Sequence, residues 1–127
     1  MTPLLCIAVA VYLEARGEGP DGMLAVADVI MERVNDSRWP DDPCSVVEQP
    51  KQFAFLPFER VEEIIRAEHD AAWSMALDAA RTTMAGEGLG SGATHFHWIG
   101  EHPYWTKNAT MIGRMGNHLF WRINKEK

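Results

Sequence analysis

Residues 3–18 read PLLCIAVAVYLEARGE, a nearly continuous apolar run that ends in two glutamates around an arginine and a glycine. The run predicts a helix over residues 3–16 that is buried over most of its surface. Glu14 lies at the edge of this helix, where removal from water favours the neutral, proton-donating form of a carboxyl group. Glu18 lies one turn further on, and Gly17 lets the backbone leave the helix. The stretch is therefore either an acid/base site or a helix end with a solvated charge cluster.

The whole chain has the size and composition of one globular domain. Its 127 residues are enough for one core, so residues 1–127 are expected to form a single domain. A net charge of −6 without a Lys/Arg cluster argues against a nucleic-acid partner and against stable membrane association. The apolar run has no basic segment before it and is too short to span a bilayer. We therefore expect it to belong to the mature core of a chain made in the cytoplasm without a signal peptide.

Two further helical stretches are predicted before residue 86, with an irregular segment between them. Apolar residues at 3/4 spacing predict a second helix from about Pro20-Asp21 to Asn35-Asp36. Residues 37–58 are expected to be irregular, with a helical turn at Val46-Val47 and a strand or extended segment over 52–55. A helical stretch follows over 59–85, with a break near 68–70.

Two aromatic, β-prone segments follow the glycine-rich loop at 86–92. Residues 93–98 and 118–123 are expected to pair as a small antiparallel ribbon, with residues 100–117 as a long connection. The chain is thus predicted to be a mainly helical α+β domain.

Cys6 and Cys44 are the only cysteines. Cys6 lies in the apolar first helix and Cys44 follows Pro43, and we interpret both as buried free thiols. A disulfide between them is the other possibility.

Four histidines lie in the last third of the chain, and His95 and His97 would face the same side of a strand. Such a pair could hold a metal ion, which makes a histidine-metal amidase one alternative. The chain has no HExxH pair and no third ligand at a recognisable spacing. Hydrogen bonding or substrate contact is therefore the favoured role, and no metal or cofactor is expected.

Aromatic side chains of the C-terminal part, alongside Gln52 and Phe53, are suited to sugar rings through stacking and hydrogen bonding. About half of the aromatic residues are expected to complete the core and the others to line a groove. The aromatic residues in question are Trp98, Tyr104, Trp105, Phe120 and Trp121, and the amide is that of Gln52, next to Phe53.

Several segments, in order, resemble the cell-wall hydrolase family of the SleB and CwlJ spore cortex-lytic enzymes. The resemblance spans nearly the whole chain. The segments that carry it are Glu14-Ala-Arg-Gly-Glu18, Gly22, Ala25-Val26-Ala27, Val29-Ile30, Arg33-Val34, Pro40, Cys44-Ser-Val-Val47, Gln52-Phe53, Gly92-Ala-Thr-His-Phe96 and Gly116-Asn-His-Leu-Phe120.

The resemblance implies a lysozyme-like, lytic-transglycosylase-like fold and cleavage of peptidoglycan glycan strands. It implies that Glu14 is catalytic, and a single glutamate suits a lytic transglycosylase that leaves 1,6-anhydromuramoyl ends. Glu18 is expected to be a supporting carboxylate, bonded to loop backbone or paired with Arg33 or Arg16. The residues expected to contact substrate are Gln52, Phe53, His95, His97, Trp98, Tyr104 and His118.

Three alternatives stay open beside the lytic transglycosylase: a hydrolytic muramidase with a second acid, the histidine-metal amidase, and a non-catalytic sugar-binding protein. The expected partner is bacterial peptidoglycan, and the chain is expected to be a monomer. The setting resembles that of a phage endolysin, which waits in the host cytoplasm before it reaches the wall. A bacterial wall-remodelling enzyme is the other setting.

Overall fold

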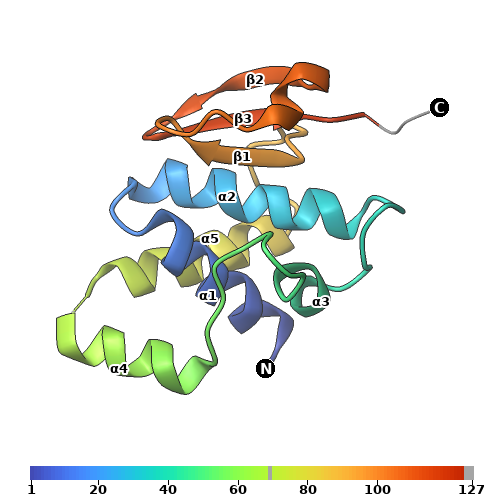
Figure 1. Cartoon of the computed structure of the whole chain (residues 1–127). Helices are drawn as coiled ribbons and strands as arrows, with labels where there is room; N and C mark the ends of the chain where they lie inside the picture. The colour runs from blue at the N-terminus through green and yellow to red at the C-terminus, as the bar shows by residue number, and fades with distance from the viewer. Residues whose placement is uncertain (69, 125–127) are drawn as a thin grey trace.

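The computed structural model of the protein describes residues 1–68 and 70–124. Figure 1 shows a small sheet lying on α2, with α1 and α5 on the other side of that helix. This mainly helical α+β architecture confirms the fold class predicted from the sequence. The elements within the described residues are α1 (Pro3–Ala15), α2 (Gly19–Val34), α3 (Pro43–Val47), α4 (Phe58–Glu68), α5 (Ala72–Met84), β1 (His95–Trp98), the 3₁₀ helix η1 (Tyr104–Asn108), β2 (Thr110–Met115) and β3 (His118–Arg122).

The first helix, α1, is the centre of the core. Residues 6–12 and Ala15 are all buried, and each large aliphatic side chain contributes about 1.5–3 kcal/mol through its burial. Thr2 caps the helix, since its Oγ1 accepts a hydrogen bond from the Leu5 backbone N–H at 3.2 Å. The buried helix predicted over residues 3–16 is confirmed. Within the described residues, neither α1 nor any other helix is long and apolar enough to cross a membrane.

A disulfide joins Cys6 on α1 to Cys44 on α3, with the two Cα atoms 5.2 Å apart. The prediction of two free thiols is therefore wrong. The residues lie 38 positions apart in the chain, and only the packing of α3 against α1 brings them together. Closing a loop of that length stabilises the fold by about 4 kcal/mol in the chain-entropy model.

The longer helices after α1 follow the predicted pattern. The second predicted helix is α2, which packs against both α1 and α5. The predicted break near 68–70 separates α4 from α5, and the Asp70 carboxylate accepts the Ala72 N–H at 2.8 Å near the start of α5. Position 69, part of that prediction, lies outside the described residues.

The segment between α2 and α4 is mostly irregular, as expected. The predicted helical turn at Val46-Val47 belongs to α3, and both side chains are buried. Residues 52–55 form no strand, so the strand alternative for them is wrong. They form a loop instead, and the backbone N–H of Ala54 donates to the Glu14 carboxylate near the end of α1.

The sheet has the strand order β1-β3-β2 with antiparallel neighbours. The predicted pairing of β1 with β3 is confirmed, with His95 opposite Trp121. The prediction of one long connection over residues 100–117 is wrong, because this segment contains η1 and β2. The turn Gly116-Asn117, with Gly116 at a φ of +61°, closes a β2–β3 hairpin, and this two-residue signal was present in the sequence.

Candidate active site

A cleft of about 780 Å³ gathers residues from helices, loops and strands. Two of the ten sequence-predicted site residues, Glu18 and Phe53, do not line it. The sequence-predicted residues that do line it are Glu14 from α1, Arg33 from α2, Gln52 from the loop before α4, His95, His97 and Trp98 from β1, Tyr104 from η1 and His118 from β3.

Glu14 lies in the last turn of α1 and is half-buried at the cleft wall. Its Oε1 accepts the backbone N–H of Ala54 at 2.6 Å, a short distance for a charge-assisted hydrogen bond. Its Oε2 accepts no hydrogen bond from the described residues. The side chain is thus fixed by one oxygen, while the other is available to a bound molecule.

Glu18 is four residues away in the chain but belongs to a different structural unit. Its carboxylate accepts the Asn117 backbone N–H at 3.0 Å and the Asn117 side-chain amide at 3.4 Å, and Oε1 lies 3.1 Å from His118 Nδ1. The side chains of Glu18 and His118 are only 10% and 8% exposed. Glu18 therefore connects the start of α2 to the β2–β3 turn.

Small residues make room for this carboxylate. A Cβ added at Gly22 would lie 2.7 Å from the Glu18 Cβ, and one at Gly116 would lie 3.0 Å from its Oε2. Of the partners expected for Glu18, loop backbone is the one that bonds it here. Arg33 bonds elsewhere, and Arg16 donates to the Tyr12 hydroxyl at 3.0 Å.

Arg33 is buried and holds two segments of the cleft wall together. Its Nε donates to the Thr94 carbonyl oxygen at 2.8 Å and its Nη1 donates to Gln52 Oε1 at 3.0 Å. Its guanidinium also lies over the Trp39 and Phe53 rings, 5.0 and 5.2 Å from their centroids. Burial lowers the pKa of Arg33 to about 10, and the neighbouring Arg38 charge adds to this effect.

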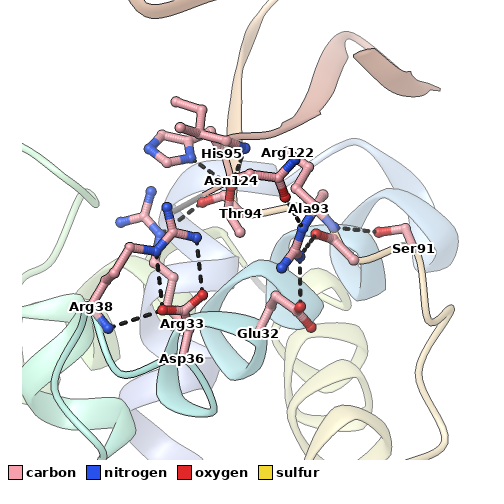
Figure 2. A network of polar contacts seen from close by, with 12 residues as sticks. Glu32, Arg33, Asp36, Arg38, Ser91, Ala93, Thr94, His95, Arg122 and Asn124 are labelled. Atoms are coloured by element: carbon pink, nitrogen blue, oxygen red, sulfur yellow. Dashed lines mark hydrogen bonds and ion pairs between the residues drawn. The ribbon is translucent and has the colours of Figure 1, made fainter. Parts of the chain in front are cut away.

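Further ion pairs surround Arg33 at the end of α2. Figure 2 shows Arg38 bonded to Asp36, and Arg122 bonded to Glu32. The Arg122 Nη1 also donates to the Gly92 carbonyl oxygen at 2.6 Å. The Arg122 bonds hold the segment before β1 and the end of β3 against α2, next to the β1 side chains that line the cleft.

The β1 histidines face one side of the strand, as the alternation predicted. Both rings contact Trp105, with centroids 5.0 Å and 5.6 Å away. Burial, together with the Arg33 and Arg38 charges, lowers the pKa of His95 to about 4, so His95 is neutral at pH 7. In His97, Nδ1 lies 2.8 Å from the Trp98 carbonyl oxygen, and a carbonyl only accepts, so Nδ1 carries a proton.

No group of three or more His, Cys, Asp or Glu side chains is placed to hold a metal ion in the part of the chain that the structure describes. The metal-based amidase alternative therefore has no three-ligand site among the described residues.

The aromatic residues divide between core and cleft. Phe53 is 8% exposed and packs against Phe96, so it supports the cleft wall from behind. Trp98 and Tyr104 line the cleft and are 53% and 84% exposed.

The sequence did not single out five residues of the cleft lining as site residues: Lys51, Phe96, Glu101, Pro103 and Trp105. Glu101 matters most, because it is the second carboxylate of the lining. Its position just after an aromatic strand, in a loop, was the available signal.

Comparison with known proteins gives a consistent result. The family described as Cell Wall Hydrolase matches residues 17–121. The spore cortex-lytic enzyme of Halalkalibacterium halodurans is 32% identical in an alignment of 122 positions that covers 90% of this chain and 33% of that protein. The enzyme of the same name from Oceanobacillus iheyensis is 31% identical, over 90% of this chain and 39% of that protein. The chain thus spans between a third and two fifths of the length of these relatives.

Two solved structures share the fold. The catalytic domain of the Bacillus cereus SleB protein superposes with a TM-score of 0.75 at 24% identity, covering 94% of this chain and 89% of that domain. The catalytic domain of the germination-specific lytic transglycosylase SleB from Bacillus anthracis gives the same TM-score at 25% identity, with 94% and 93% covered.

Proposed function

This chain belongs to the cell wall hydrolase family, and from that premise we propose that it cleaves peptidoglycan glycan strands with Glu14 as its catalytic residue. The family match confirms the resemblance found in the sequence. One observation carries the assignment: Glu14 is a carboxylate that lines the cleft, is fixed through one oxygen and accepts no hydrogen bond on the other from the described residues.

The proposed reaction is that of a lytic transglycosylase. Protonated Glu14 donates its proton to the oxygen between N-acetylmuramic acid and N-acetylglucosamine, and the bond from that oxygen to C1 of the muramoyl unit breaks. The Glu14 carboxylate then takes the proton of the muramoyl C6 hydroxyl, whose oxygen bonds to C1. The product has a 1,6-anhydro ring, and neither water nor a cofactor enters the balance.

The hydrogen bond from Ala54 supports this use of Glu14. Because Oε1 accepts that N–H, the proton of the acid form belongs on Oε2. Arg33 holds Gln52, two residues before Ala54 in the same loop. We therefore assign Arg33 a positioning role: it fixes the loop that orients the Glu14 carboxyl group.

Glu18 is assigned a supporting role. Its oxygens are engaged by Asn117 and His118, so it is not available for an acid/base step in the cleft. It orients His118, which lines the cleft and is proposed to contact the sugar with Gln52, His95, His97, Trp98 and Tyr104.

A hydrolytic muramidase is the second candidate, because the cleft lining includes a second carboxylate, that of Glu101. Such an enzyme would use one carboxyl group as acid and the other to activate water or bind the sugar. Its products would have reducing ends.

Mass analysis of fragments released from purified sacculi tests the proposal. We expect wild-type protein to release muropeptides lighter by one water than reducing ones, and Glu14→Gln to release none while it stays folded. Glu87→Gln, an exposed glutamate outside the cleft lining, is the matched control and should act as wild type. Continued release of fragments by Glu14→Gln would refute the catalytic assignment.

A further inference from the structure

The turn that follows β1 is closed by two hydrogen bonds between the same two residues. The Glu101 backbone N–H donates to the Trp98 carbonyl oxygen at 2.9 Å, and the Trp98 backbone N–H donates to Glu101 Oε1 at 3.1 Å. Ile99 inside this turn donates its N–H to the Asn117 carbonyl oxygen at 2.9 Å. The turn is thus fixed to the β2–β3 hairpin, and its two cleft-lining side chains have defined positions.

The Trp98 indole lies directly on the backbone of the turn. A Cβ added at Gly100 would lie 1.7 Å from a ring carbon of Trp98, so a larger residue there would displace the indole from this position. Despite this contact the side chain stays 53% exposed at the cleft. A large aromatic ring held in place while half of it faces solvent loses little conformational entropy when a flat apolar surface stacks on it.

The Glu101 carboxylate complements this ring. Oε1 is occupied by the Trp98 N–H, whereas Oε2 has no hydrogen bond to any of the described residues. An exposed aromatic face next to an acceptor oxygen suits a pyranose ring, which has apolar C–H faces and hydroxyl or acetamido N–H donors at its edge.

We propose that Trp98 and Glu101 form a sugar-binding platform for one pyranose ring of the glycan strand. The ring stacks on Trp98, and a hydroxyl or acetamido N–H donates to Glu101 Oε2. This inference rests on the proposed function, and it assigns Glu101 to substrate binding rather than to the chemical step.

The platform lies where the main cleft meets a second cavity of about 530 Å³. Glu101, His97, Pro103 and Tyr104 line both spaces. A ring bound at this junction allows the strand to continue into the second cavity. The platform is therefore expected to favour long glycan strands over short ones.

Binding measurements test the platform without turnover. Peptide-free glycan strands are titrated calorimetrically into Glu14→Gln protein, alone and combined with Trp98→Ala, Glu101→Gln or Glu87→Gln. We expect Trp98→Ala to raise Kd about tenfold and Glu101→Gln to raise it several-fold. Glu87→Gln should leave Kd unchanged. Thermal unfolding checks that each variant is folded.

Two further variants sharpen the test. Gly100→Ala should displace the indole and weaken binding as Trp98→Ala does, although Trp98 itself is retained. In the otherwise unchanged enzyme, Glu101→Gln should raise KM for long strands and leave kcat within about twofold.

An unchanged Kd in both Trp98→Ala and Glu101→Gln would overturn the platform. A large fall in kcat for Glu101→Gln with unchanged Kd would also overturn it, because Glu101 would then act on the reacting atoms. If Glu14→Gln still cleaves strands, the proposed function fails instead. The platform is then decided by the KM values of Trp98→Ala and Glu101→Gln in the otherwise unchanged chain.

Discussion

Glu14, in the last turn of α1, and Glu18, which precedes α2, are four residues apart, yet their carboxylates have different surroundings. The carboxylate at the end of α1 accepts one hydrogen bond from the part of the chain that the structure describes, and it lines the cleft. The carboxylate at the start of α2 has three polar contacts and is 10% exposed. The difference teaches that the number of fixed partners decides whether a carboxyl group can exchange a proton with substrate or only supports structure.

The largest expected effect belongs to Glu14→Gln. Loss of the proposed acid/base group should lower the rate of sacculus clearance by at least about a hundredfold, while the glutamine oxygen can still accept the Ala54 N–H. Turbidity assays and thermal unfolding measure the two quantities. A variant that loses its fold along with its activity would show that Glu14, too, is structural, and the contrast with Glu18 would disappear.

Removal of the disulfide should act on stability and not on chemistry. The double variant Cys6→Ala/Cys44→Ala frees α3 from α1 and should lower the free energy of unfolding by about 4 kcal/mol. Urea unfolding gives this value, with reduced wild-type protein as a second test. At urea concentrations too low to unfold the variant, its kcat should stay near that of wild type, because Glu14 keeps its contact with Ala54. A loss of kcat in the folded variant would show that the disulfide contributes to the active site.

Glu18→Ala is expected to lower stability, whereas Glu14→Gln is expected to lower activity. Removal of this carboxylate leaves the Asn117 N–H without its acceptor and takes away the oxygen that lies 3.1 Å from the buried His118 Nδ1, which should cost about 2–4 kcal/mol of stability. Urea unfolding measures the loss, with the exposed Glu87→Ala as control. Wild-type stability with activity abolished would mean that Glu18 takes part in the reaction.

Arg33→Met tests whether the contacts of a buried structural residue affect the position of Glu14. The variant keeps the apolar contacts with Trp39 and Phe53 but releases Gln52 and Thr94, so stability should fall by about 2–3 kcal/mol. Because the loop with Ala54 is then less well held, kcat should fall as well. Arg60→Met on the exposed face of α4 is the control. An unchanged kcat would limit Arg33 to a structural role.

The smallest expected effect is a dependence of stability on pH. The pKa of His95 is about 4 in the folded chain and about 6.5 when unfolded. The unfolded state therefore binds more protons between these values, so this stability is complete above about pH 6.5 and is lost as pH falls toward 4. Urea unfolding at pH 7 and pH 4.5 should show a smaller loss for His95→Gln than for wild type; equal losses would contradict a neutral His95.

The outline of the fold could be predicted because its signals are local. The apolar run in α1, the spacing in α2 and the β-prone segments each carry their own periodicity. Strand β2 was missed because its residues are mostly exposed and include Gly113, which weakens any strand pattern. The Gly116-Asn117 turn would have revealed it.

The site was partly predictable for a different reason. Residue chemistry and the family motif indicated most of the cleft lining, but chemistry alone cannot separate Phe53, which packs behind the wall, from Trp98, which faces the cleft. Glu101 has no motif of its own. Its relevance appears only when the turn after β1 brings it into the lining.

The sequence by itself determined the helical framework, the buried helix that carries Glu14 and the family to which the chain belongs, because these depend on short-range patterns and on motif residues. Only the tertiary structure decided that Cys6 bonds Cys44, that Glu18 bonds a turn 99 residues away, and that Ala54 orients Glu14. The physical reason is that each of these contacts joins segments distant in sequence, and their proximity results from the packing of the whole chain.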